Sequence, residues 1–413
     1  MRGSVKLTMR DNEKLFSFEF ISLNVISFFA FCNMAVFYSF FSYLARLDIP
    51  VEWRGFLVGL EPMSAFMLRL FVVPILHVGN AVTAMIVALV MLTAALFSYA
   101  WVVTIPGLIA LRTFHGAAFV LLVSASMALL VYFIPREKSG QGFGIVSVSV
   151  LVPYAIMPHI TEILLRYTQN EAQIYRGVTI LALPAFIMLF VLRKRLGSTL
   201  SSMEGALLRR PSLEEIRRNL KETRIALLLA VNFFLYLCYA SVFFFMKESI
   251  AGTLITDVGG FFTVSTLVMI ILRISGGFFF DKVDKTRLLQ VATLLLVPCF
   301  LLLGRMDSDR ILYLMAGYYG LCIGFIMPLL NAVLFTLSPP HLRGVNTNLA
   351  LFAMDAAFFL SPYAGGAFIA AGYSFGALFG ICAGFIAVNL VLLMVLGTLK
   401  GTPQPEPMRD KAP

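Results

Sequence analysis

The sequence contains too few charged residues for a water-soluble protein of its length. Charged side chains make up 13% of the 413 residues, whereas soluble domains carry about 25%. Hydrophobic residues make up 60%, and a water-soluble fold cannot bury that much apolar surface. We therefore expect a lipid bilayer to surround most of the chain.

Cysteine is also scarce, and the chemical motifs of enzymes are missing. The five Cys residues all lie in apolar segments, and their spacing matches neither a disulfide framework nor a zinc site. No P-loop, nucleophile–base set or metal-ligand cluster stands at a recognisable spacing. The sequence therefore predicts no catalytic residue, no metal and no cofactor, and it favours an ion gradient over ATP as the energy source.

Long apolar segments predict twelve membrane-spanning helices. A span needs roughly 20 apolar residues at about 1.5 Å per residue, and backbone groups in lipid must form hydrogen bonds within their own helix. The predicted spans cover residues 16–45, 54–76, 81–103, 105–134, 142–166, 174–192, 224–248, 257–280, 288–304, 309–337, 346–370 and 374–399.

The positions of Lys and Arg predict the orientation of these spans. Most of the 32 Lys and Arg residues lie at the termini or in loops on the same side as the termini, above all in residues 193–224. Cytoplasmic loops carry such an excess, so we expect a multi-pass protein with both termini in the cytoplasm. The expected location is the plasma membrane, which is the inner membrane in a Gram-negative bacterium. The net charge of +10 reflects this asymmetry and does not indicate a nucleic-acid partner.

The longest polar interruption predicts how the chain is divided. We expect a six-helix bundle in residues 1–192, a linker in 193–223, a second six-helix bundle in 224–399 and a disordered tail in 400–413. Within the linker, Ser212 followed by Glu215 is a capping-box pattern that opens a short amphipathic helix. This helix either lies on anionic lipid headgroups or only joins the two halves.

An internal repeat relates the two halves. The spacing from Arg69 to Arg273, 204 positions, also aligns several Gly and Pro residues that are rarely matched by chance. The first and seventh spans do not align at this spacing, so the repeat is partial. The other aligned pairs are Gly55 with Gly259, Gly116 with Gly320, Pro135 with Pro339, Gly140 with Gly344, and Pro158 with Pro362.

With these features the chain resembles the major facilitator superfamily. The stretch "GGFFFDKVDKTR", residues 276–287, is similar to the family's loop signature, although the matching first-half loop has His77 where Asp281 stands. The stretch "LIALRTFHGAAF", residues 108–119, resembles a motif of the drug:proton antiporter branch, whose fifth-span motif is nearly absent. The resemblance implies an all-α integral membrane protein whose two pseudo-symmetric six-helix bundles enclose a central cavity.

The resemblance also implies a gate at the loop after the eighth span, where it would latch the halves in the outward-facing state. The alternative is a solvated loop that only carries positive charge. We expect Arg69 and Arg273 to be structural, with long side chains that reach back to the cytoplasmic surface. The predicted gating residues are Arg69, Arg273, Gly277, Asp281, Lys282 and Arg287.

Ionisable residues within spans are costly in lipid and are therefore functional candidates. Glu61 and Arg112 are expected at similar depth, and a buried arginine needs a carboxylate partner, so we predict that they pair. Protonation of the carboxylate would release the arginine and bias one conformation, unless the pair is a static ion pair. Glu162, one turn after His159, either belongs to this layer or pairs with Arg166 at the surface.

Asp355 stands alone near the middle of the eleventh span. It is either a coupling or cation-binding carboxylate or a hydrogen-bonded acid between the halves. The predicted proton-coupling residues are Glu61, Arg112, Asp355 and Glu162.

Aromatic and polar residues at helical spacing predict a substrate-binding surface. Spans one, four, seven and ten line the cavity in the family, and polar tips on aromatic bodies suit an amphipathic organic solute. Helix packing is the alternative explanation for this pattern. The predicted substrate-binding residues are Asn33, Phe37, His115, Asn232, Tyr236, Tyr239, Phe243 and Tyr318.

The leading functional hypothesis is a secondary transporter that exports a small organic or lipophilic compound in exchange for protons. We expect a monomer whose partners are the lipid bilayer, the small-molecule substrate and protons. The alternative within transport is uptake or facilitated diffusion of an organic acid bound by Arg112. A transport-dead sensor or scaffold is less favoured because the sequence lacks a large appended soluble domain.

Overall fold

The computed structural model describes residues 15–168, 170–201, 211–250, 255, 258–276 and 282–399, and these are helical without any strand. The all-α fold class is therefore confirmed. The α-helices are α1 (Phe18–Ala35), α2 (Phe40–Arg46), α3 (Val51–Val72), α4 (Val78–Ser98), α5 (Ile105–Leu130), α6 (Ser139–Thr168), α7 (Glu171–Val178), α8 (Ala182–Ser201), α10 (Leu213–Leu220), α11 (Thr223–Ser249), α12 (Val258–Ser275), α14 (Lys285–Leu303), α15 (Asp309–Leu337), α16 (Arg343–Ala370) and α17 (Phe375–Thr398).

Eleven helical segments among the described residues are long and apolar enough to cross a membrane. A shorter apolar helix, Gly259–Ser275, lies where the eighth span is predicted. The predicted first span is broken, since a 3₁₀ turn at Val36–Ser39 separates α1 from α2. The predicted sixth span lies within one apolar helical segment, Glu171–Leu196, in which a 3₁₀ turn at Thr179–Leu181 joins α7 to α8. The chain is thus a multi-pass membrane protein, and the count of twelve spans stays a prediction.

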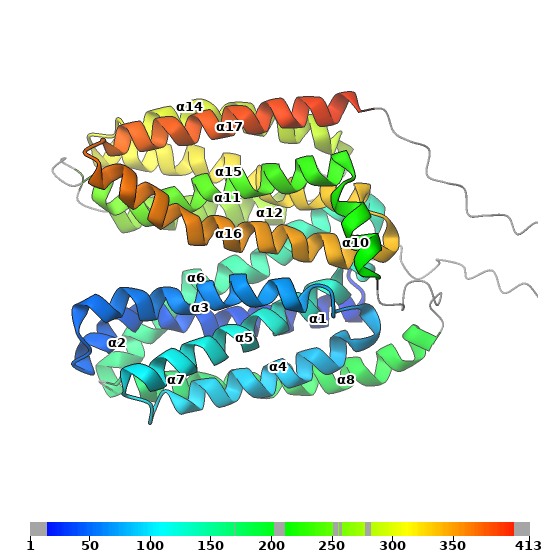
Figure 1. Ribbon diagram of the computed structural model, residues 1–413, viewed down its shortest axis with the longest axis vertical. Coiled ribbons are helices and arrows are strands. Elements are labelled where there is room, and N and C mark those ends of the chain that lie inside the picture. The colour runs from blue at the N-terminus through cyan, green and yellow to red at the C-terminus, as the bar shows by residue number, and fades with distance from the viewer. Residues whose placement is uncertain are drawn as a thin grey trace, which may run out of the picture.

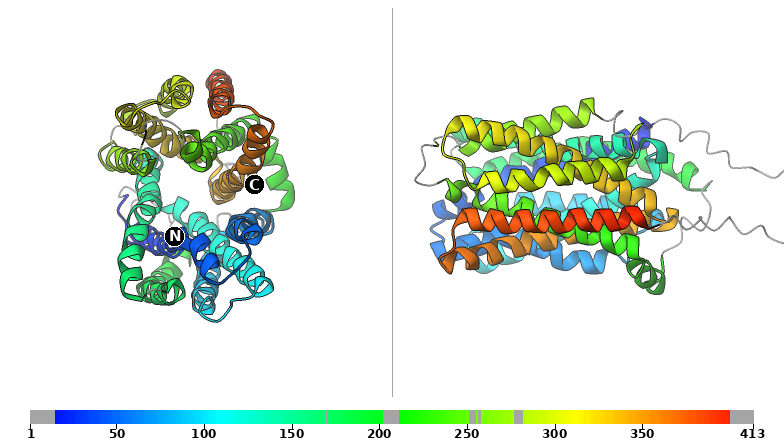
Figure 2. Two further views of the ribbon diagram at one scale, coloured as in Figure 1. Left: turned by 90° about the vertical axis from the view of Figure 1, so that its left-hand side faces the viewer. Right: turned by 90° about the horizontal axis from the view of Figure 1, so that it is seen from above.

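The helices form two groups that lie side by side, α1–α8 and α11–α17 (Figure 1). We call them the first and second bundle. The linker helix α10 lies at the end of the molecule where α17 ends (Figure 1), and we call this the linker end. Seen from the opposite end, the bundles are two adjoining groups of helices (Figure 2). The division into domains at residues 192 and 223 remains a prediction.

The 204-residue repeat is visible in how the helices pack. A Cβ atom on Gly116 of α5 would lie 2.8 Å from the carbonyl oxygen of Glu61 on α3. A Cβ atom on Gly320 of α15 would lie 2.6 Å from the carbonyl oxygen of Ser265 on α12. Glu61 and Ser265 are themselves 204 positions apart, so both bundles use glycine for the same close helix contact.

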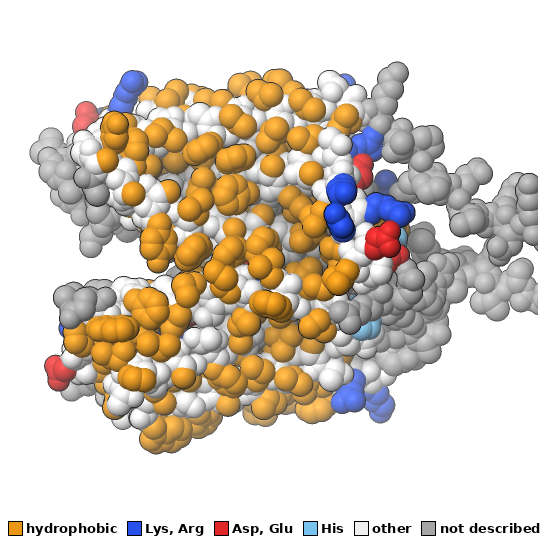
Figure 3. Space-filling model, viewed as in Figure 1, with side chains coloured by type: hydrophobic (Ala, Val, Ile, Leu, Met, Phe, Trp, Pro, Cys, Tyr) orange, Lys and Arg blue, Asp and Glu red, His pale blue; other side chains and the backbone are white. Residues whose placement is uncertain are grey.

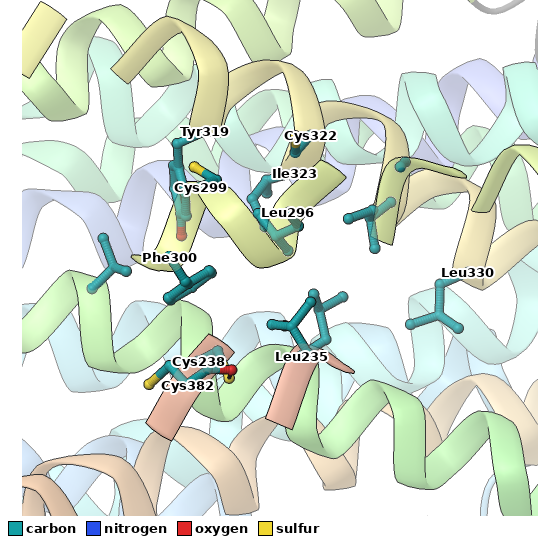
Figure 4. Close-up of a cluster of buried hydrophobic side chains, with 14 of the residues drawn as sticks. Leu235, Cys238, Leu296, Cys299, Phe300, Tyr319, Cys322, Ile323, Leu330 and Cys382 are labelled. Atoms are coloured by element: carbon teal, nitrogen blue, oxygen red, sulfur yellow. Dashed lines mark hydrogen bonds between the residues drawn. The ribbon is translucent and has the colours of Figure 1, made fainter. Parts of the chain in front are cut away.

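Each bundle has its own apolar interior. In the second bundle, four of the five cysteines pack among Leu, Ile and aromatic side chains, as Figure 4 shows around Phe300 and Tyr319. All five cysteines are buried and free, as expected for small core residues. On the face shown in Figure 3, the side chains between the two ends are mostly apolar, whereas charged ones gather at the two ends. This distribution suits a protein whose flanks contact lipid.

The linker contains the predicted capped helix. Ser212 accepts a hydrogen bond from the backbone N–H of Glu215, whose side chain accepts one from the backbone N–H of Ser212. Ile216 of this helix, α10, packs in a small cluster with Val73 of the first bundle and Leu342 of the second. The linker helix therefore contacts both bundles at the linker end.

Candidate functional site

One ion pair joins the two bundles in the middle of the molecule. Arg69 of α3 donates through Nε to Oδ2 of Asp355 on α16 at 2.6 Å. Its Nη1 donates to the hydroxyl of Ser124 on α5 at 2.7 Å. The side chain of Arg69 is 2% exposed and that of Asp355 is 12% exposed. The sequence placed no charged partner near Asp355. In the structure, Asp355 pairs with Arg69 across the interface between the bundles.

The expectation that Arg69 and Arg273 reach back to the linker-end surface is wrong. Both side chains are 2% exposed. The physical reason is helix direction, since Cα–Cβ bonds tilt toward the helix N-terminus. Both α3 and α12 run toward the linker end, so their side chains lean toward the middle of the molecule.

Arg273 occupies the position in the second bundle that corresponds to Arg69, but its surroundings differ. Its Nη2 lies 3.5 Å from the sulfur of Met327, and its Nε has no hydrogen-bond partner. The positions equivalent to Ser124 and Asp355 carry Pro328 and Leu151, which offer no side-chain acceptor. Among the described residues, no carboxylate pairs with Arg273.

A second charged pair lies inside the first bundle. Nη2 of Arg112 is 3.8 Å from Oε2 of Glu61, so the structure brings together the two residues predicted to pair. The guanidinium also donates to the carbonyl oxygens of Leu57 at 3.1 Å and Val58 at 3.0 Å. It lies 4.6 Å from the ring centroid of Phe40, within cation–π range. Arg112 therefore contacts a carboxylate, two carbonyl oxygens and an aromatic ring.

Aromatic rings also pack around Arg112. Phe37 stacks on Tyr175 at 4.3 Å between centroids and lies 5.0 Å from the ring of His115. His115 is fully buried, and its Nδ1 lies 3.2 Å from the hydroxyl of Tyr99. Phe37 and His115, both predicted to bind substrate, are therefore packed inside the first bundle.

A small cavity of about 50 Å³ lies between the bundles. Eight of its lining residues form pairs that are 204 positions apart, so it lies on the axis that relates the two halves. Asn232 and Tyr236 of α11, both predicted to bind substrate, complete part of its wall. The paired lining residues were not predicted from the sequence, although the 204-residue spacing could have identified them. These pairs are Met127 with Asn331, Phe143 with Thr347, Val146 with Ala350, and Ser147 with Leu351.

The other predicted substrate-binding residues are dispersed. Tyr239 stacks on Tyr319 of the second bundle at 6.4 Å. Phe243, further along α11, is 55% exposed. Asn33 donates to the carbonyl oxygen of Phe29 in its own helix. Tyr318 donates to the carbonyl oxygen of Leu295 and does not line the cavity.

The bundles are in close contact on the linker side of the cavity. A Cβ atom on Gly344 would lie 3.2 Å from the backbone of Ala128, and one on Gly144 would lie 3.3 Å from the carbonyl oxygen of Arg273. Asn348 donates to the carbonyl oxygen of Ser124 at 3.2 Å. These contacts close the space between the two bundles at the linker end.

The space between the bundles opens toward the other end. Tyr154 of α6 is 49% exposed, although Glu61 and Tyr239, the latter from the second bundle, lie within electrostatic range of its hydroxyl. Its side chain therefore faces open space between the bundles. A notch at the end opposite the linker is visible in the space-filling view (Figure 3).

The predicted gate loop is only partly within the described residues. Gly277 and Asp281 lie outside them, as do the side chains of Glu162 and His159. Lys282 is exposed. Arg287 is 3.6 Å from Asp284, and both side chains are largely exposed. Asp284 caps α14 by accepting hydrogen bonds from the backbone N–H groups of Thr286 and Arg287.

Comparisons with known proteins agree with this architecture. The family model described as the Major Facilitator Superfamily matches residues 23–362 and residues 256–412. No curated protein sequence matches the chain.

Three similar solved structures are transporters. The human organic anion transporter MFSD10 (TETRAN) is 17% identical with a TM-score of 0.66, covering 91% of this chain and 99% of its own. FucP in the outward conformation is 11% identical with a TM-score of 0.67, covering 91% and 98%. A variant of the E. coli fucose:proton symporter FucP is 11% identical with a TM-score of 0.66 and the same coverage. At these identities the likeness establishes the fold alone.

Proposed function

Since the chain belongs to the Major Facilitator Superfamily, a family of transporters and not of enzymes, we propose that it is a proton-coupled transporter that exports a small organic solute. Secondary transport across a lipid bilayer follows from the family. Proton coupling, export and the residues that perform them are the proposal.

The observation that carries the proposal is the ion pair between Arg69 and Asp355, which links the bundles at 2.6 Å. A buried carboxylate that pairs with an arginine favours the conformation that keeps them together. Protonation of Asp355 would remove its charge and weaken this link, so the bundles could separate at the linker end. A deprotonated Asp355 would favour the conformation described here, which is closed at that end.

This dependence suggests the direction of transport. Suppose the linker end faces the cytoplasm of a plasma-membrane protein, as the Lys and Arg distribution predicts. Protons that reach Asp355 from outside then promote opening toward the cytoplasm, and their release inside promotes the return. A solute that binds on the return leg leaves the cell in exchange for protons.

Glu61 and Arg112 have a supporting role in this proposal. Glu61 lies within electrostatic range of Arg112, Asp355 and the partly exposed Tyr154. Protons could therefore pass from Glu61 to Asp355. Glu162 stays a further candidate, and a monomer is the proposed functional unit, because each chain carries a complete cavity.

Transport in proteoliposomes tests this proposal. A solute that stabilises the purified protein against heat is first identified by screening, and its movement is then measured with and without a pH gradient. We expect gradient-driven movement that a protonophore abolishes, and reduced gradient dependence with retained solute binding in Glu61→Gln. Movement that ignores the pH gradient would contradict proton coupling while leaving facilitated diffusion possible.

The alternative, uptake or facilitated diffusion of an organic acid, needs a cation for the acid. Arg112 is a poor choice because Glu61, two carbonyl oxygens and aromatic rings already surround it. Arg273 has no carboxylate partner within the part of the chain that the structure describes, and this observation keeps an acidic solute in consideration.

A further inference from the structure

We propose that Arg273 binds the negative charge of the transported solute, which is a small organic anion with a carboxylate group. This inference names the solute class and rests on the transport function proposed above. Three observations support it: Arg273 has no carboxylate partner among the described residues, two tyrosines lie near it, and one of them lines a cavity between the bundles.

The first observation is a break in the internal symmetry. Arg69 and Arg273 are equivalent, buried to the same extent and directed toward the middle of the molecule. Arg69 has Asp355 and Ser124 as partners. The equivalent positions for Arg273 carry Leu151 and Pro328, so among the described residues only Arg69 has an internal carboxylate partner.

A buried guanidinium without an anion is strongly unfavourable. Arginine stays protonated in proteins, so Arg273 keeps its positive charge in this buried position. Its Nε is buried and without a hydrogen-bond partner. The thioether sulfur of Met327 is a weak acceptor. An external carboxylate could accept two parallel hydrogen bonds from the guanidinium, which is the geometry that arginine favours.

The second observation is the pair of phenols near Arg273. Tyr236 and Tyr239, one turn apart on α11, both lie within electrostatic range of its guanidinium. Their hydroxyl groups can donate hydrogen bonds to a carboxylate oxygen that the arginine leaves free. Tyr236 also interacts electrostatically with Asp355. The solute anion and the proposed proton site would therefore influence each other through one residue.

The third observation is the cavity on the symmetry axis, whose wall includes Tyr236. Its volume of about 50 Å³ exceeds the share of one water molecule in the liquid, about 30 Å³. It can hold a carboxylate group but not a complete organic solute in this conformation. The apolar wall formed by Met127, Val146 and Leu351 suits a hydrocarbon body, which would extend into the opening toward Tyr154.

Leu151 allows a test that does not require removal of Arg273. Leu151 packs against the buried cluster of the second bundle, and it corresponds to Asp355 in the repeat. Leu151→Asp should supply the missing internal carboxylate, pair with Arg273 and compete with an external anion. Leu151→Asn is the matched control, because asparagine has nearly the same shape as aspartate and carries no charge.

The experiment uses the purified full chain in detergent. Thermal unfolding is measured for the wild type and both Leu151 variants, first alone and then with acetate, butyrate and benzoate. The neutral amides acetamide, butyramide and benzamide are the controls. We expect at least one carboxylate to stabilise the wild type while its amide does not. The apparent affinity for that carboxylate should fall at least tenfold in Leu151→Asp and less than threefold in Leu151→Asn.

The unfolding temperatures of the Leu151 variants without any added carboxylate also test the proposal. Leu151→Asp should unfold at a higher temperature than Leu151→Asn, since only the aspartate can neutralise Arg273. A lower unfolding temperature for Leu151→Asp would overturn the inference, as would carboxylate binding that is equal in all three proteins or absent from the wild type.

The inference and the proposed function can fail separately. If carboxylate binding follows Leu151 and Arg273 but transport ignores the pH gradient, the solute class stands and proton coupling is wrong. If a neutral solute moves with protons and Arg273→Lys leaves that movement unchanged, coupling stands and the anion site is wrong.

Discussion

Loss of the charge on Asp355 should shift the conformational equilibrium of the transporter toward opening at the linker end. The pair with Arg69 is short, at 2.6 Å, and largely buried. Removal of one partner of a buried ion pair costs about 3–5 kcal/mol. In Asp355→Asn the amide oxygen can still accept a hydrogen bond from Arg69, so we expect the lower value. About 3 kcal/mol corresponds to roughly a hundredfold change in the ratio of two conformations.

Cysteine accessibility measures this shift. Val345, near the linker-end start of α16, is 4% exposed in the closed arrangement, and the five native cysteines are all buried. A Val345→Cys variant should react slowly with a water-soluble thiol reagent added from the linker side. The same variant with Asp355→Asn should react at least tenfold faster, after subtraction of the rate for a protein without the introduced cysteine.

Asp284 provides a matched control because its pair with Arg287 is surface-exposed. Surface ion pairs contribute about 0–1 kcal/mol, so Asp284→Asn should leave the labelling rate at Val345→Cys within about twofold. Equal labelling rates in Asp355→Asn and Asp284→Asn would refute the view that the pair between Arg69 and Asp355 holds the linker end closed.

Three further predictions concern stability and are checked by thermal unfolding in detergent. Gly116→Val should lower the unfolding free energy by at least about 1–3 kcal/mol, because a Cβ atom there lies 2.8 Å from the carbonyl oxygen of Glu61; Gly317→Val, with open space around it, should change it little, and equal effects would argue against the close helix contact. Arg112→Ala leaves Glu61 buried without its partner and should cost about 3–5 kcal/mol, so a loss below 1 kcal/mol would mean that the pair contributes little. Ser212→Ala removes a helix cap and should cost about 1 kcal/mol, with no loss in Ser212→Asp, which can still cap; an equal loss in both variants would contradict the capping role.

Much of the architecture could be predicted because lipid imposes simple rules. A span must be apolar over a fixed length, and a helix cap has a local signature such as Ser212 with Glu215. The internal repeat carried long-range information as well, since Gly116 and Gly320 form equivalent contacts that no local pattern specifies. Breaks within spans, such as Val36–Ser39, escaped prediction because the broken segments remain apolar.

The site was predicted less well because pairing depends on side-chain direction across helices. The pairing of Glu61 with Arg112 was predicted because both lie at similar depth in their spans, and the structure confirms the contact. Such a prediction is reliable only when the two helices are neighbours. Asp355 was expected either to couple or bind a cation, or to be hydrogen-bonded between the halves, but Arg69 was not named as its partner because it was assigned to the surface. The tilt of Cβ atoms toward the helix N-terminus, applied to the direction of α3, would have placed Arg69 at the depth of Asp355.

Residues in the cavity wall were missed for a different reason. Met127, Val146 and Ala350 have no chemical feature that marks them as functional. Their common property is the 204-residue spacing to a partner across the axis, which becomes informative only when the position of that axis is known.

The most direct test of the account compares net proton-driven transport with exchange at equal pH, in the wild type and in Asp355→Asn. Proteoliposomes are loaded with the carboxylate identified by thermal unfolding, and its movement is followed with and without a pH gradient. We predict that Asp355→Asn loses acceleration by the gradient and still exchanges solute across the membrane. An Asp355→Asn protein that responds to the gradient as the wild type does would contradict the assignment of Asp355 as the proton-coupling residue.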